Sequence, residues 1–126
     1  MANKEVEIEA YQFHFRPQAA PVWGFPGGLS AQQCYGYIFL QSAAPVNYFV
    51  LAIVDDGVGA LPDSTTQVSG STWAAAAAIE LENLPALLDV LRNEKPIYMG
   101  MSDTSPDRNA IQTVAEPVGE GEMSLP

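Results

Sequence analysis

The stretch CYGYIFLQSAAPVNYFVLAIV, from Cys34 to Val54, decides the fold of this chain. It holds two nearly continuous apolar runs, Cys34 to Leu40 and Asn47 to Val54, and each has the length and the aromatic and β-branched content of a strand. The residues between them, Ser42 to Pro45, suit a tight connection. The stretch therefore predicts a β-hairpin whose strands are apolar on both faces.

Strands that are apolar on both faces need a cover on both faces. The sequence predicts one clear helix, from Pro85 to Asn93, where leucines recur at helical spacing and Pro96 follows. Nine residues of helix are roughly 14 Å long, enough to shield a few strands on one face. The other face must be covered by long loops, by curvature of the sheet or by a second subunit. We expect a homodimer, because twofold dimers are the commonest oligomers, with a strongly curled monomer as the alternative.

The chain before the hairpin begins with an alternating segment, Glu5 to Ala10, which is typical of a half-buried strand with a solvated acidic face. Tyr11, Phe13 and Phe15 then occupy the face that the glutamates held. Either the strand bulges near Ala10, or it runs from a solvated edge into a covered region.

Three further segments are ambiguous or lack a regular pattern. Trp73 to Leu81 contains five consecutive alanines, which favour a helix by propensity, but the preceding turn residues and the following Pro85 favour a strand. We therefore predict a strand there. Arg16 to Gln33 and Val58 to Gln67 are predicted to be loops because they are rich in turn-forming residues.

Strands are also predicted for Lys95 to Met101 and for Ala110 to Ala115. Together these segments predict one α+β domain over residues 1–126, with a mostly antiparallel, curved sheet of about six strands. The short helix Pro85–Asn93 is expected to pack on one face of the sheet. Residues 116–126 form an acidic C-terminal tail.

The charge balance excludes several classes of partner. Fifteen acidic side chains stand against five basic ones, so the net charge is -10 at pH 7, which repels nucleic-acid phosphates and anionic lipid. The first ten residues are too polar for a secretory signal, and no apolar run reaches the roughly 18 residues of a membrane-spanning helix. The single cysteine, Cys34, cannot form an internal disulfide, so a reducing cytoplasm is expected.

Three residues are candidates for ligand binding: Trp23, Phe25 and His14. Trp23 and Phe25 lie in the Pro/Gly-rich loop and could line a small apolar pocket. The favoured alternative is that this loop packs onto the sheet face that the helix leaves bare. His14 would act as a catalytic base only with a nucleophile and an acid nearby, and otherwise it is a strand histidine at an edge or interface.

Signatures of catalytic, metal or phosphate sites are weak. No nucleophile elbow surrounds any serine, and the glycines near Phe25 lack the lysine of a phosphate-binding loop. The aspartates of the two turn-rich loops do not alternate as the ligands of a calcium loop do. Cys34 has no basic neighbour in the sequence and is expected to be a buried structural thiol. We assign no catalytic residue, metal or cofactor. The charged residues of these two loops are Asp55, Asp56, Asp63, Asp103, Asp107 and Arg108.

The leading functional hypothesis is a homodimeric binding module for a protein or a small apolar ligand. The alternative is an enzyme of unrecognised class with its site at a dimer cleft near His14. In outline, an apolar dimer of antiparallel strands also resembles curved-sheet single-strand binding proteins of the Whirly type. Those proteins need a basic groove, and this chain has only scattered basic residues, so a nucleic-acid partner is not expected. The basic residues are Lys4, Arg16, Arg92, Lys95 and Arg108.

Overall fold

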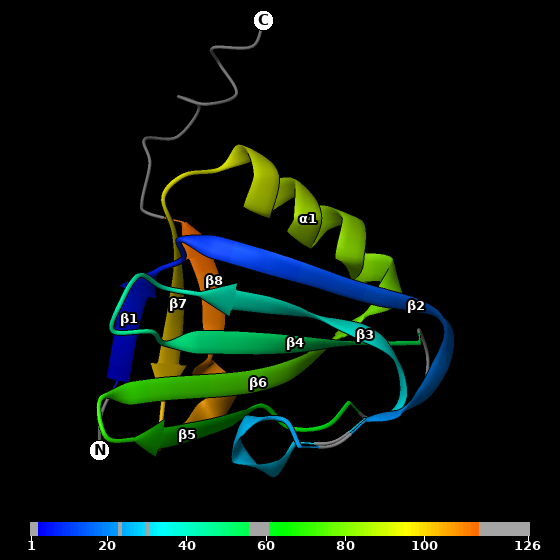
Figure 1. Cartoon of the computed structure of the whole chain (residues 1–126), viewed down its shortest axis with the longest axis horizontal. Coiled ribbons are helices and arrows are strands. Elements are labelled where there is room, and N and C mark those ends of the chain that lie inside the picture. Colours follow the sequence, from blue (N-terminus) through cyan, green and yellow to red (C-terminus); the bar gives the residue numbers. More distant parts are fainter. Residues whose placement is uncertain (1–2, 23, 30, 56–60, 114–126) are drawn as a thin grey trace, which may run out of the picture.

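The computed structural model describes residues 3–22, 24–29, 31–55 and 61–113, and in this part of the chain it places eight strands in two sheets beside one α-helix (Figure 1). The predicted α+β class is confirmed, but the strands form two sheets rather than the predicted single curved sheet of about six strands. Three short 3-10 helical turns are labelled η. In chain order the elements are β1 (Asn3–Glu7), β2 (Ala10–Val22), η1 (Pro26–Gly28), β3 (Ala31–Gln41), β4 (Tyr48–Val54), β5 (Thr65–Ser69), β6 (Thr72–Glu80), η2 (Leu81–Asn83), α1 (Leu84–Asn93), β7 (Ile97–Ser102), η3 (Pro106–Arg108) and β8 (Ala110–Thr113).

The larger sheet has the strand order β2-β3-β4-β6-β5. The predicted hairpin is confirmed, because β3 and β4 pair antiparallel from Cys34–Val54 to Gln41–Tyr48. The alanine-rich segment forms strand β6, as predicted, and β6 pairs parallel to β4. The other neighbouring strands of this sheet pair antiparallel.

The smaller sheet has the order β1-β7-β8, and all its neighbours pair antiparallel. It lies behind the larger sheet in Figure 1, and α1 lies along the upper edge of both. We call the face of the larger sheet that packs on the smaller sheet and α1 its inner face, and the opposite face its outer face. Buried residues from both sheets and α1 form one apolar core: Ile38, Leu40, Phe49, Leu51, Ile53, Ala75, Leu84, Leu91, Ile97, Met99 and Met101.

The outer face is partly covered by the segment that follows β2. Phe25 packs against the buried cluster of Cys34, Ala52 and Val54, which is separate from the main core. The Thr65 hydroxyl on β5 donates a hydrogen bond of 2.6 Å to the Pro26 carbonyl, and the Gly27 N–H donates to the Gln67 side chain at 3.0 Å. This part of the Pro/Gly-rich loop therefore covers the face that α1 leaves bare.

The change of parity after Glu9 marks a change of sheet. The Ile8 N–H donates to the Ile97 carbonyl of β7 at 2.7 Å, whereas the Glu9 N–H donates to the Gln41 carbonyl of β3 at 2.8 Å. The chain therefore leaves the smaller sheet and enters the larger one between these two residues. The parity change therefore comes from two strands in different sheets, rather than from either predicted alternative, a bulge near Ala10 or one strand that runs from a solvated edge into a covered region.

Two predicted loops contain strands. β2 continues from Arg16 to Val22 through irregular pairing with β3, and β5 occupies Thr65–Ser69. Pro17 and Pro21 are tolerated in β2 because it is the edge strand of its sheet, where a missing N–H costs no ladder bond. Both segments were predicted to be loops because they are rich in turn-forming residues. Residues 56–60 of the second predicted loop lie outside the described residues.

The remaining predicted elements agree with the structure to within two residues where it describes them. α1 begins one residue before the predicted Pro85 and ends at the predicted Asn93. β7 occupies Ile97–Ser102, and β8 occupies Ala110–Thr113. The last two residues predicted for β8, and the predicted acidic tail, lie outside the described residues.

Candidate functional site

The longest edge strand in the described part of the molecule is β2, which lies outermost in the larger sheet. From Ala10 to Phe15 it pairs with β3 without a register shift, and this segment contains no charged residue and no proline. An unprotected edge offers unpaired backbone N–H and C=O groups to a further strand. We call the segment Ala10–Phe15 the β2 edge.

A row of exposed aromatic rings follows the β2 edge. Tyr11, Phe13 and Phe15 are 38%, 44% and 46% exposed, although their register with Leu40, Ile38 and Gly36 places them on the inner side of the sheet. None of the three rings belongs to either buried cluster, so the row is left uncovered on the inner side.

The rings of the row stack on one another. The Phe13 and Phe15 ring centroids lie 6.0 Å apart, and Phe15 stacks on Tyr35 at 5.7 Å. The sequence showed the alternation of these residues, but it offered no reason to assign them a binding role.

The other sheet edges are shorter, charged or covered. β1 carries Lys4, Glu5 and Glu7 in five residues, and β8 has only four residues. β5 has five residues and is held by the hydrogen bonds to the η1 segment described above. Charges, short length and covering segments are the usual protections against edge-to-edge pairing. The β2 edge carries no charge between its ends and belongs to the longest of the edge strands, and α1 runs beside it (Figure 1).

The predicted ligand-binding residues lie on the outer face where the structure describes them. The His14 ring stacks on Tyr37 with the centroids 5.0 Å apart, and Tyr37 pairs with Ala52, part of the cluster on which Phe25 packs. The structure therefore brings His14 and Phe25 to the same face, across Tyr37. Trp23 lies outside the described residues.

A second ring pair extends the aromatic character of this face. Phe39 and Tyr48 stack with their centroids 5.1 Å apart, and both residues are half-buried. With His14 and Tyr37 they form what we call the outer aromatic group. Sequence reasoning missed Tyr37, Phe39 and Tyr48 as surface residues because their strands are apolar on both faces.

The surroundings of His14 do not form a catalytic arrangement. His14 is exposed, and among the described residues its ring stacks on Tyr37 rather than bonding to an acid or a hydroxyl. A general base needs both its substrate and an orienting group within hydrogen-bond reach. The enzyme hypothesis therefore gains no geometric support at this residue.

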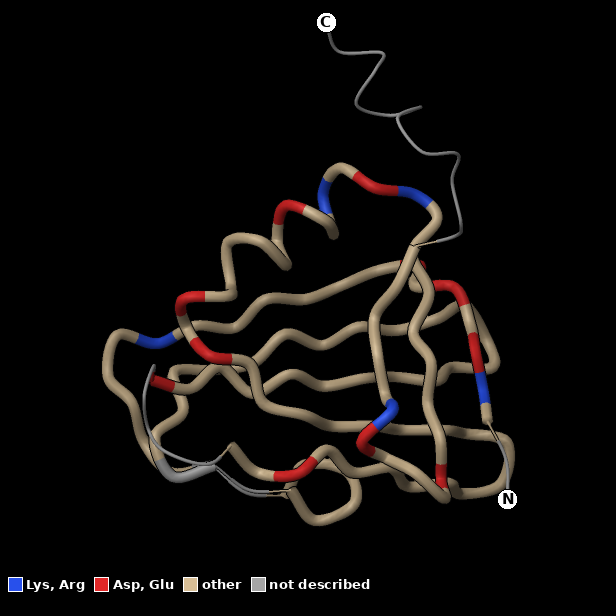
Figure 2. The backbone as a smooth tube through the Cα atoms, turned by 180° about the vertical axis from the view of Figure 1, so that it is seen from behind, with Lys and Arg blue, Asp and Glu red and all other residues tan. Residues whose placement is uncertain are grey.

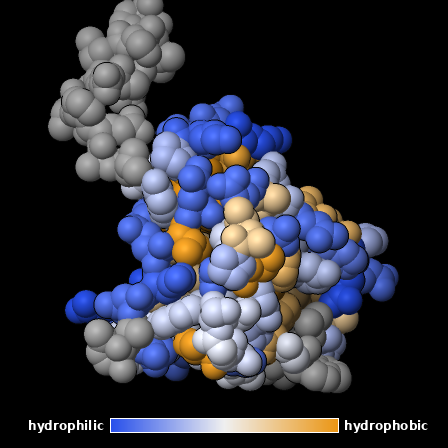
Figure 3. Space-filling model, turned by 60° about the vertical axis from the view of Figure 1, so that its left-hand side comes forward, coloured by the Kyte–Doolittle hydropathy of each residue, from blue (hydrophilic) through white to orange (hydrophobic). Residues whose placement is uncertain are grey.

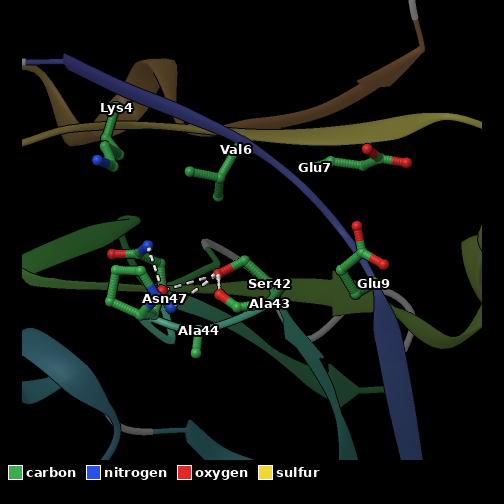
Figure 4. A pocket seen from close by; sticks show the side chains of 9 residues that line it. Lys4, Val6, Glu7, Glu9, Ser42, Ala43, Ala44 and Asn47 are labelled. Atoms are coloured by element: carbon green, nitrogen blue, oxygen red, sulfur yellow. Dashed lines mark hydrogen bonds between the residues drawn. The ribbon is translucent and has the colours of Figure 1, made fainter.

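A shallow cleft lies between β1 and the turn that joins β3 to β4 (Figure 4). It has a volume of about 270 Å³ and presents Glu7 and Glu9 near one end and Lys4 near the other. Asn47 shapes the turn, because its amide donates to the Pro45 carbonyl at 3.2 Å and its N–H donates to the Ser42 hydroxyl at 3.0 Å. The cleft carries charges of both signs and contains neither His14 nor Phe25.

The basic side chains do not converge on one face. Lys4, Arg16, Arg92 and Arg108 lie on β1, on β2, in the last turn of α1 and in η3 respectively, and Figure 2 shows the basic positions scattered among acidic ones. Viewed from the side of β1, the surface is largely hydrophilic with several small hydrophobic areas (Figure 3). A groove that follows a nucleic-acid backbone needs a continuous basic surface, which the described residues do not provide.

Within the described ranges, no group of three or more His, Cys, Asp or Glu side chains is placed to hold a metal ion. Cys34 is fully buried, and its thiol lies 2.9 Å from the Gly36 carbonyl. Arg16 donates to the carbonyls of Cys34 and Ala20 at 3.2 and 3.4 Å, so this cation stabilises the irregular part of the β2–β3 pairing.

Among the helices that the structure describes, none is long and apolar enough to cross a membrane. Comparisons with protein-family models, with curated proteins and with solved structures find no match to this chain.

Proposed function

We propose that this protein is a homodimeric binding module that associates through the β2 edge. The observation that supports the proposal most directly is a six-residue, uncharged, unpaired strand edge with three exposed aromatic rings. Aromatic side chains that keep this much exposed surface contribute strongly to protein interfaces.

The charge distribution favours contact at this edge. The chain has a net charge of -10, so most approaches of two copies bring acidic surfaces together. The β2 edge carries no charge between Glu9 and Arg16. Two copies that meet at this edge therefore bury aromatic surface without bringing charged side chains of the edge itself together.

The surface proposed for dimer contact is a sheet edge, whereas the sequence predicted contact through a bare sheet face. The inner face is covered by the smaller sheet and α1 except along the β2 edge, and part of the outer face is covered by the segment around Phe25. The uncovered part of the outer face holds the outer aromatic group, which is the place for the small apolar ligand in this proposal. The buried single thiol of Cys34 is the feature that favours a reducing cytoplasm as the working location.

Sedimentation equilibrium of the full chain tests the proposal. The contact involves about six residues in each copy, compared with about 20–30 in an interface of standard size, so we expect a dissociation constant of about 10 µM. Phe13→Lys should convert the chain to a monomer up to about 200 µM, because it places a charge in the centre of the contact. Circular dichroism should show that the variant remains folded.

Val68→Lys is the matched control. Val68 is 41% exposed on the edge strand β5, close to the 44% of Phe13, so the substitution adds the same charge at a similarly exposed edge position. We expect this variant to dimerise like the wild type. A wild-type chain that stays monomeric at about 200 µM, or equal effects of the two substitutions, would contradict the proposal.

A further inference from the structure

Two β2 edges can pair in several registers, and one of these registers matches their side chains better than the adjacent ones. We infer that the two β2 edges pair antiparallel around a twofold axis at Phe13, so that Tyr11 of each copy faces Phe15 of the other. This inference rests on the proposed dimer and adds the geometry of the partner. Side chains alternate between the two faces along β2, and a twofold dimer uses the same surface of both copies.

Symmetry restricts the possible alignments. Residues directly opposite each other in an antiparallel pair lie on the same face of the sheet, and a slip by one residue moves every side chain to the other face. When the twofold axis is perpendicular to the sheet, the inner faces of both copies lie on the same side of the joined sheet. Within the β2 edge the axis can then pass at Gln12, at Phe13 or at His14.

The aromatic row favours the axis at Phe13. In that alignment Phe13 faces its own copy, and Tyr11 faces Phe15 twice, so three aromatic pairs form. With the axis at Gln12, Phe15 faces Glu9 and only two aromatic pairs remain. With the axis at His14, Tyr11 faces Pro17 and again two aromatic pairs remain. Cross-strand aromatic pairs are among the interactions that stabilise paired strands.

The side chains on the outer side favour the same alignment. With the axis at Phe13, Gln12 faces His14 of the second copy, so an amide and an imidazole that can hydrogen-bond lie side by side. With the axis at His14, the two imidazoles face each other instead. The Phe13 axis also places Glu9 of each copy near Arg16 of the other. The Arg16 guanidinium is half-buried and donates to the Cys34 carbonyl of its own chain at 3.2 Å, so this contact adds little to the preference.

The pairing would join the two larger sheets into one continuous sheet. Figure 1 shows α1 running beside β2, so a strand added at this edge also lies next to that helix. On the outer side, the stacked His14–Tyr37 pair of each copy would lie beside the twofold axis. The outer aromatic groups of the two copies would then form one surface across the dimer.

Disulfide trapping distinguishes the three alignments without removing an aromatic ring of the row. Gln12→Cys and His14→Cys are each made in the full chain, and one carries a mass tag so that mixed dimers can be recognised. Each variant alone and an equal mixture are oxidised at about 100 µM, above the expected dissociation constant. A disulfide needs Cβ atoms roughly 3.5–4.5 Å apart, which directly opposite residues approach and diagonal residues do not.

We expect the mixture to form a mixed disulfide, which joins the thiol of the Gln12→Cys variant to the thiol of the His14→Cys variant. The mixture should give on the order of fivefold more cross-linked dimer than either variant alone. The wild type is the blank, because Cys34 is fully buried. Self-linking of Gln12→Cys alone indicates the axis at Gln12, and self-linking of His14→Cys alone indicates the axis at His14; either result overturns the inference.

Sedimentation of the same samples separates the failure of this inference from the failure of the proposed dimer. If sedimentation shows dimers but no mixed disulfide forms, only the alignment around Phe13 is rejected. Monomers reject the β2 dimer as well and leave the edge open to a segment of another protein.

Discussion

At the scale of single residues, Gly36 shows how one position sets the path of two strands. It lies in β3 with φ of +147°, opposite Phe15, and a Cβ atom placed on it would overlap the His14 carbonyl oxygen. The β2 and β3 backbones can approach this closely only because glycine has no side chain. The position of the β2 edge on its sheet therefore depends on Gly36.

We expect Gly36→Ala to lower the free energy of unfolding by about 3 kcal/mol, because it combines a backbone clash with an unfavourable positive φ. Thermal or urea unfolding monitored by circular dichroism measures the change. Gly100→Ala is the matched control, since Gly100 also lies in a strand but a Cβ there meets no atom within 4 Å. That variant should stay within about 0.5 kcal/mol of the wild type. Equal effects of the two substitutions would refute this account of Gly36.

At the scale of elements, Asn109 connects the two sheets through hydrogen bonds. Its side-chain amide donates to Ser64 Oγ, the Thr65 carbonyl and Thr66 Oγ1 at 3.0, 3.2 and 2.8 Å. Its side-chain oxygen accepts from the N–H of the buried Ser102 at 2.8 Å. The end of the smaller sheet is thereby attached to β5 and the residue before it.

Asn109→Ala should reduce the free energy of unfolding by about 2 kcal/mol, because it removes these bonds and leaves the buried Ser102 N–H without its acceptor. The measurement is again urea unfolding. Asn93→Ala provides the comparison, since the Asn93 amide is exposed and bonds only within α1. We expect a change within about 0.5 kcal/mol there. A loss at Asn93 as large as that at Asn109 would argue against a connecting role.

At the scale of the whole molecule, the net charge of -10 opposes association while the β2 edge favours it. Salt screens the repulsion between two acidic copies more than it weakens contacts between aromatic rings. We therefore expect the dissociation constant of the dimer to fall about threefold between roughly 20 and 300 mM NaCl, since the net charge outweighs the attraction between Glu9 and the half-buried Arg16 at the two strand ends. Sedimentation equilibrium measures it. A dimer that weakens with salt would mean that attraction between charges, rather than aromatic contact, holds it together.

Much of the fold could be predicted because its signals are local. The β3–β4 hairpin follows from two apolar runs around a turn, and α1 follows from leucines at helical spacing. β6 could be assigned despite its alanines because turn residues and a proline bound it. The predictions failed where hydrogen-bonded pairing with a neighbouring strand decides the structure of a segment whose own residues favour turns. β2 continues through Pro17 because an edge strand tolerates proline, and β5 forms because β6 lies beside it.

The candidate site was predicted only in part. His14 and Phe25 were named from their residue types, and the structure places both on the outer face. The aromatic row of the β2 edge was visible as an alternation, but its exposure depends on which other elements pack against it. No periodicity in one strand reports which side chains the rest of the fold covers, so this part of the site required the tertiary structure.

The sequence alone determined the α+β class, the central hairpin, the helix, the acidic surface and the lack of recognisable catalytic spacing, because these depend on composition and on neighbours within a few residues. The tertiary structure decided that the chain changes sheets after Ile8, that two sheets rather than one enclose the core, and that β2 is left as an exposed edge. Those features depend on pairing between strands far apart in the chain. That is why the expectation of a dimer could be drawn from the apolar strands, whereas its place on the molecule could be proposed only from the structure.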